Sequence, residues 1–255
     1  MKRIVIAALA LALTASAAFA AQVNTYTVTG SISPAKAGTK KKPVPVGVTF
    51  DYTVGEQNGQ RPSPVKEYSI EFDGLVTNGK YFKSCTAASI NAAGSDAGCS
   101  KAAVVGSGQV LNEAGPTTDP SNKSTTCYLD LTLYNGGNKK AAIYLKGGPN
   151  DPRGAQYSCP LTISQAIDAN YVKTPKGEAL DFQVASTLLH PITGVDNAVV
   201  NVTSKVKKLT TKVKGKTVGY YTSNGGCVKH KRGITVTFTG ENGQTAKKSA
   251  SLSCS

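Results

Sequence analysis

The chain has 255 residues and a formal net charge of +14, which arises from 29 basic and 15 acidic residues. Tryptophan is absent and histidine occurs only twice. The composition therefore disfavours a specific nucleic-acid interface, which needs stacking aromatics, and a histidine-rich metal centre. The excess of lysine favours a polyanionic partner instead.

A short apolar stretch dominates the first twenty residues. Lys2 and Arg3 precede an apolar run over residues 4–15, and Ala18-Phe19-Ala20 supplies the small residues that a signal peptidase accepts. We therefore expect residues 1–20 to be a signal peptide and the protein to be secreted or extracytoplasmic. No later apolar run reaches the roughly 18 residues of a membrane-spanning helix, so we expect no transmembrane segment after cleavage.

Period-two alternation of apolar and polar residues is the main pattern after residue 20, and it predicts strands with one buried face. Gly- and Asn-rich turns separate the alternating segments, which is typical of antiparallel hairpins. Residues 162–171 are the only segment that could form a short helix. We therefore expect an all-β fold, an antiparallel β-sandwich of jelly-roll type reinforced by disulfides. The alternating segments are residues 26–28, 48–54, 68–72, 127–133, 141–145, 180–184, 200–202 and 234–238.

The composition changes at about residue 197, where the chain becomes dense in lysine. We expect a β-sandwich domain over residues 21–200, with basic C-terminal strands and a hairpin over residues 201–255 packed on the same sandwich. Residues 34–45 combine three consecutive lysines with prolines, which indicates an exposed loop near a sheet edge. Residues 112–126 and 146–158 are longer than hairpin turns, so a binding rim would lie there.

All six cysteines follow the predicted cleavage site, so in an exported protein they are expected to form disulfides. Sequence alone leaves their connectivity open. Proximity along the chain favours sequential pairing, which joins Cys85 to Cys99, Cys127 to Cys159 and Cys227 to Cys254. No Cys-x-x-Cys spacing occurs, which argues against zinc, and we expect neither a metal nor a cofactor.

A basic run is the most function-like feature of the sequence, because no acidic residue occurs between Asp196 and Glu241. Alternation with valines predicts strands whose outward face is lysine, and such a face attracts an anionic cell-wall polymer or an acidic polysaccharide. Alternatively, the lysines only protect an edge strand and keep the chain soluble, which is the commoner role of a single-sign block. The predicted contact residues are Lys205, Lys207, Lys208, Lys212, Lys214, Lys216, Lys229, Lys231 and Arg232.

The sequence contains no Gly-x-Ser-x-Gly elbow, no phosphate-binding Gly-x-x-x-x-Gly-Lys-Ser/Thr loop and no His-Glu-x-x-His, so it predicts no catalytic residue. His190 follows two leucines and is expected to be structural. A carboxylate pair would still allow a secreted polysaccharide hydrolase, with Glu71, Asp73, Asp130 and Asp181 as the candidates. Ordinary solvent-facing strand positions explain these carboxylates too, so a non-catalytic secreted protein is the leading hypothesis.

Several short motifs follow one another in a fixed order. They are PAKAGTKKKP at residues 34–43, Cys85, Cys99 before VGSG at 105–108, YLKG at 144–147, and Cys227 with KHKR at 229–232 before Cys254. In this order the chain resembles uncharacterised exported actinobacterial proteins of the Solirubrobacter and Conexibacter type, although Ser100 stands where those proteins have proline. The resemblance implies export, a β-rich fold and no catalytic residue.

Overall fold

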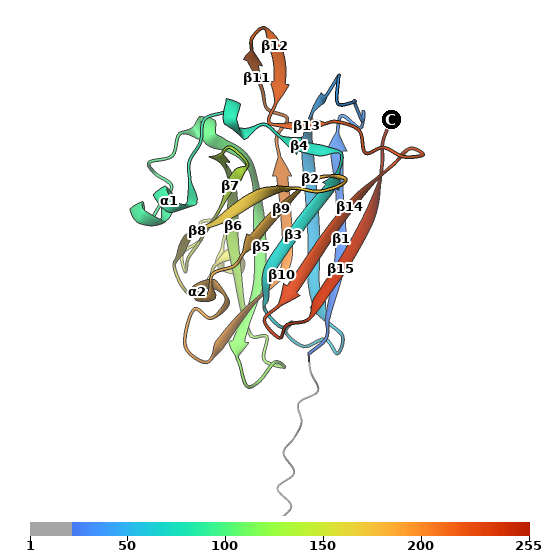
Figure 1. Cartoon of the computed structure of the whole chain (residues 1–255). Coiled ribbons are helices and arrows are strands. Elements are labelled where there is room, and N and C mark those ends of the chain that lie inside the picture. The colour runs from blue at the N-terminus through green and yellow to red at the C-terminus, as the bar shows by residue number, and fades with distance from the viewer. Residues whose placement is uncertain (1–21) are drawn as a thin grey trace, which may run out of the picture.

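The computed structural model describes residues 22–255 (Figure 1), and the predicted signal peptide lies outside the described residues. Two short helices, α1 (Ala87–Ala93) and α2 (Ser186–Leu189), and three single turns, η1 (Gly79–Tyr81), η2 (Lys101–Ala103) and η3 (Ala155–Tyr157), accompany the strands. A separate hairpin consists of β11 (Thr210–Val213) and β12 (Lys216–Gly219). The strands of the main sheet are β1 (Asn24–Ser33), β2 (Val44–Glu56), β3 (Val65–Asp73), β4 (Leu75–Thr77), β5 (Val104–Pro116), β6 (Thr125–Gly137), β7 (Lys140–Gly147), β8 (Ile163–Lys173), β9 (Gly177–Gln183), β10 (Val195–Val206), β13 (Tyr221–Ser223), β14 (Lys231–Gly240) and β15 (Thr245–Ser253).

One antiparallel sheet of 13 strands forms the body of the molecule, in the order β15-β14-β3-β9-β8-β7-β6-β5-β10-β2-β13-β4, with β1 also paired to β2. Because every pair is antiparallel, the connections gather at two opposite ends of the strands. The all-β, disulfide-reinforced fold is thus confirmed. The jelly-roll order is not seen, since β5 to β9 follow one another as a meander.

The sheet curls until its two edges meet at a seam. Strand β1 contacts β14 and β15, yet the described strands include no ladder between β1 and either of them. Side chains close this seam instead: the Tyr26 ring stacks on Phe238 with centroids 4.2 Å apart. Burial of aromatic surface therefore replaces backbone hydrogen bonds here.

The core fills the inside of the curled sheet, as the alternating pattern predicts. Along β2, Val46, Val48, Phe50, Tyr52 and Val54 are all buried, while the residues between them are partly or fully exposed. The segment after residue 200 belongs to the same sheet, because β13 pairs with β2 and β14 pairs with β3.

The possible helix over residues 162–171 is wrong, because these residues lie largely in strand β8. This strand pairs with β7 on one side and β9 on the other. Burial within this strand alternates accordingly, since Ile167 and Ala169 face the core while Asp168 and Asn170 are exposed. None of the helices in residues 22–255 has the length and apolar character needed to cross a bilayer.

Three disulfides reinforce the sheet and confirm the sequential pairing, namely Cys85–Cys99, Cys127–Cys159 and Cys227–Cys254. The first holds the segment around α1, whose Ile90 packs on the outer face of the sheet against Tyr144. Strand β7 is consequently buried on both faces near this helix. The third ties the chain end to the basic segment.

Candidate functional site

Two segments far apart in sequence meet at one end of the molecule, and together they form what we call the lysine-rich end, residues 34–43 and 205–231. Ala37 donates its backbone N–H to the Ser255 carbonyl at 2.6 Å, and Gly225 donates to the Ala37 carbonyl at 3.1 Å. The Ser223 hydroxyl also donates to the Ala37 carbonyl. The β1–β2 connection is therefore fastened to the segment that leads into β14.

The lysine-rich end contains no acidic residue and twelve lysines, every one of them exposed. Eight of the nine residues predicted from the basic run belong to this set, and four further lysines come from the β1–β2 connection. The twelve are Lys36, Lys40, Lys41, Lys42, Lys205, Lys207, Lys208, Lys212, Lys214, Lys216, Lys229 and Lys231.

The hairpin β11–β12 carries three of these lysines away from the body of the sheet, at the top of Figure 1. Lys214 and Gly215 form its two-residue turn with φ of +48° and +76°, the left-handed pair that a tight hairpin requires. An isolated two-stranded hairpin is only marginally stable in water. Its base is anchored because Tyr220 donates its N–H to the Leu209 carbonyl at 2.9 Å, and Leu209 packs against the core.

Two of the lysines expected on outward strand positions lie elsewhere. Lys207 follows the end of β10, and Lys214 lies in the hairpin turn. Both remain exposed, because turns and strand ends point long side chains into solvent. Lys212 occupies a strand position in β11, where its ammonium group donates to the Thr217 hydroxyl at 2.8 Å.

The prediction that Arg232 contacts the polymer is wrong, because its side chain is buried. Only 2% of this residue is exposed, and its guanidinium donates to the Ser223 hydroxyl at 2.6 Å and to the Gly225 carbonyl at 3.1 Å. Burial lowers the pKa of Arg232, and the nearby Asp73 carboxylate opposes this effect. Arg232 thus supports the lysine-rich end from inside.

The twelve lysines are free of ion pairs within the part of the chain that the structure describes. Its salt bridges involve Arg61, Lys139, Lys140, Arg153, Lys176 and His190 instead. A lysine without a carboxylate partner keeps its charge available to an external anion. The positive field of this end is therefore not neutralised by ion pairs of these lysines, and salt in the solvent screens it.

The opposite end of the strands is balanced in charge. Three basic and three acidic residues occur in its connecting segments, which are Arg61, Lys123, Arg153, Asp119, Asp151 and Glu241. His190 lies here between two carboxylates, with Nδ1 3.1 Å from Asp196 and Nε2 2.9 Å from Glu241. Both ring nitrogens are thus engaged, in agreement with the expected structural role of this histidine.

The four candidate carboxylates do not all gather in one place. Glu71 and Asp73 lie on β3 and Asp181 on the neighbouring β9, but Asp130 lies on β6, separated from β9 by two strands. Glu71 accepts a hydrogen bond from Thr174, Asp73 accepts one from the Gly233 N–H, and Asp130 pairs with Arg153 at 2.9 Å. Within residues 22–255 no cluster of three or more His, Cys, Asp or Glu side chains could hold a metal ion.

Comparison with known proteins gives no match to a family model, a curated protein or a solved structure.

Proposed function

We propose that this is a secreted, non-catalytic protein that adheres through its lysine-rich end to an anionic polymer, such as wall teichoic acid or an acidic polysaccharide. One observation carries the proposal. Two segments more than 160 residues apart bring twelve exposed lysines and no acidic residue to the same end, while the opposite end is balanced in charge.

A polymer fits this arrangement better than a small anion. The lysines are spread over a protruding hairpin, a long connection and a tight turn, so they create a broad field without converging on one point. Exposed charges act over about 8 Å at physiological ionic strength. Lysines on neighbouring segments therefore act jointly on a chain of repeating negative charges, and only weakly on an isolated one.

The competing explanation is that the lysines only maintain solubility and protect free edges. Such lysines need only be spread over the surface and along edge strands. Lys247 and Lys248 on the edge strand β15 are of this kind. The concentration of the other lysines at one end, on segments held together by backbone hydrogen bonds, favours a binding role for them.

The test compares two triple variants with the same change of net charge. In the first, Lys207, Lys212 and Lys214 at the lysine-rich end become glutamate. In the matched control, the exposed Lys146, Lys247 and Lys248 become glutamate, because they lie on the body of the sheet. Retention on teichoic-acid-bearing cell wall and on a sulfated resin is measured across a salt series, and thermal melting confirms that each variant is folded.

We expect the parent and the control to be retained at low salt and released as salt rises, and the first variant to be lost from both supports. Equal retention of all three proteins, or equal loss from both variants, would refute a site at the lysine-rich end. Failure of the parent to bind at moderate salt would leave solubility as the role of these lysines.

A further inference from the structure

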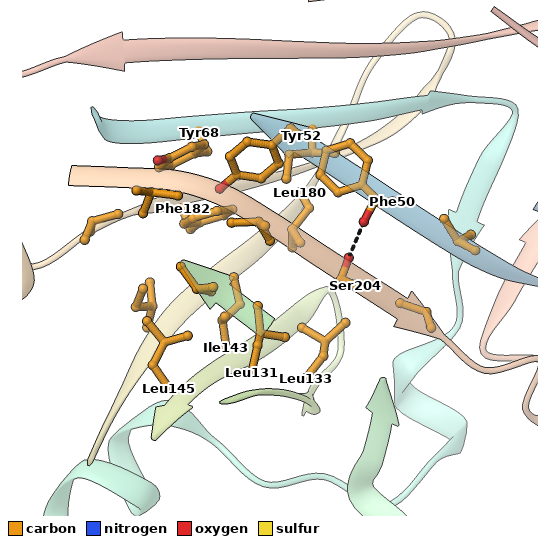
Figure 2. A pocket seen from close by; sticks show the side chains of 18 of the residues that line it. Phe50, Tyr52, Tyr68, Leu131, Leu133, Ile143, Leu145, Leu180, Phe182 and Ser204 are labelled. Atoms are coloured by element: carbon orange, nitrogen blue, oxygen red, sulfur yellow. Dashed lines mark hydrogen bonds between the residues drawn. The ribbon is translucent and has the colours of Figure 1, made fainter. Parts of the chain in front are cut away.

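The curled sheet encloses an apolar cavity of about 130 Å³ that the proposed polymer binding does not use. Figure 2 shows how side chains from both halves of the sheet point into it, with Tyr52 and Tyr68 on one side and Leu131 and Ile143 on the other. Leu180 projects between them and remains partly accessible, although its neighbour Ile70 on β3 is buried. The core is therefore not completely filled around Leu180, and the cavity extends to this side chain.

The size of the cavity limits what can occupy it. An apolar cavity of about 150 Å³ in another protein stays dry and binds benzene. Sites for drug-sized ligands are larger, about 300 to 1,000 Å³. A molecule with one ring, or a short branched chain, matches the space in this protein.

Polar atoms in the cavity wall indicate which polar group a bound molecule should carry. The Tyr68 hydroxyl and the Asn197 side-chain oxygen are buried, and neither makes a hydrogen bond of ordinary length within residues 22–255. The hydroxyl of the neighbouring Tyr52 is the protein group that acts on Tyr68, through a longer and weaker contact. Both residues line the cavity toward the end that is closed by α2, where the Asn197 amide donates to the Leu188 carbonyl at 2.8 Å. Tyr68 is only 3% exposed, so bulk water does not satisfy its hydroxyl. A buried polar group without a partner is costly and is usually satisfied by something.

The opposite end of the cavity offers no such free group. Glu178 lines it, but this carboxylate accepts hydrogen bonds from the backbone and side chain of Thr77 and from Lys139. The hydroxyls of Tyr171 and Tyr221 lie 2.7 Å apart and satisfy each other. Recognition of a polar group on a ligand is therefore left to the end that contains Tyr68.

We propose that the cavity binds a small apolar molecule that carries one hydroxyl group, such as a simple phenol. Its apolar part lies against Leu180, Leu131 and Ile143, and its hydroxyl forms hydrogen bonds at the end of the cavity that contains Tyr68 and Asn197. This site is independent of the lysine-rich end and holds whether or not the protein binds a polymer.

Binding of benzene and of phenol to the oxidised protein tests the proposal, by calorimetry and by the shift in melting temperature. Leu180→Phe adds bulk inside the cavity, whereas Val172→Phe adds bulk at a position that is 45% exposed on β8 and serves as the matched control. Tyr68→Phe removes the free hydroxyl and leaves the ring. Should Leu180→Phe fail to fold, Ile143→Phe replaces it.

We expect the parent and Val172→Phe to bind both probes, with phenol the tighter, and Leu180→Phe to bind neither. Tyr68→Phe should weaken phenol by about fivefold, the value of one neutral hydrogen bond, and leave benzene unchanged. No binding of either probe to the parent, or undiminished binding to the cavity-filling variant, overturns the proposal. Equal affinity of the parent for phenol and benzene overturns the role of the polar end.

Discussion

Replacing Cys127 and Cys159 by alanine should be the most destabilising removal of a disulfide in this protein. The bond joins residues 32 positions apart, against 27 for Cys227–Cys254 and 14 for Cys85–Cys99. The chain-entropy relation then gives losses of about 3.7, 3.5 and 3.0 kcal/mol in the free energy of unfolding. Cys127 and Cys159 are also each 4% exposed, so their replacement removes buried sulfur as well.

The assay is urea unfolding and thermal melting of each double alanine variant beside the oxidised parent, both followed by circular dichroism. A loss of this size should lower the melting temperature by about 7 to 15 °C in a chain of this length. The informative quantity is the order of the variants, because all three disulfides stabilise the same sheet. A smaller loss for the Cys127 and Cys159 variant than for the Cys85 and Cys99 variant would refute the reasoning from loop length.

Three further outcomes follow from the opposite end and from a buried amide. The hydrogen bond with Glu241, and to a smaller extent Asp196, raises the pKa of His190 above 6.5. The protonated His190 therefore stabilises the fold fully below pH 6.5, and this stabilisation is lost as pH rises through the folded-state pKa. His190→Gln should abolish this loss in melting curves recorded between pH 5 and 9. Arg61→Met should cost about 3 kcal/mol or more in urea unfolding, because the buried guanidinium donates charged hydrogen bonds to two carbonyls, at 2.6 and 2.7 Å. Asn135→Ala should cost about 2 to 3 kcal/mol in the same assay, because it removes a buried amide that donates to the carbonyls of Gly79, Phe82 and Lys83, of which the Gly79 carbonyl is buried. For either variant, a loss below about 1 kcal/mol would contradict the role assigned to the residue.

The strands could be predicted from the sequence because a half-buried strand records its two faces in alternate residues. The segments around Phe50, Tyr68, Leu131 and Phe238 all lie in strands, and proximity along the chain was enough to pair the cysteines. The helix over residues 162–171 was wrong because short apolar runs do not distinguish a strand from a helix by period alone. Pairing with β7 and β9 decides that case.

The candidate site could be predicted only in part, because it depends on which connections share an end of the sheet. The exposure of Lys40 to Lys42 follows from the composition of their loop. The attachment of this loop to the segment before β14 depends on hydrogen bonds of Ala37 with Gly225 and Ser255, which the sequence does not reveal. The burial of Arg232 could not be predicted, because Arg232 belongs to a run of basic residues whose other members are exposed. The cavity leaves no signal in the sequence either, since Leu180 looks like any other core leucine.

At the seam, β1 can separate from the β14–β15 pair without the loss of a backbone ladder, because these strands are in contact but not paired. Elsewhere, each step around the sheet is held by hydrogen bonds between neighbouring strands. Along β1, separation requires unstacking of rings such as Tyr26 and Phe238, whereas backbone hydrogen bonds of Ala35 and Ala37 with Ser255 hold the seam together at the lysine-rich end. Amide protons on the free edges of β1 and β15 should therefore exchange with deuterium sooner than those of β5 to β7, because the seam opens before the central strands separate.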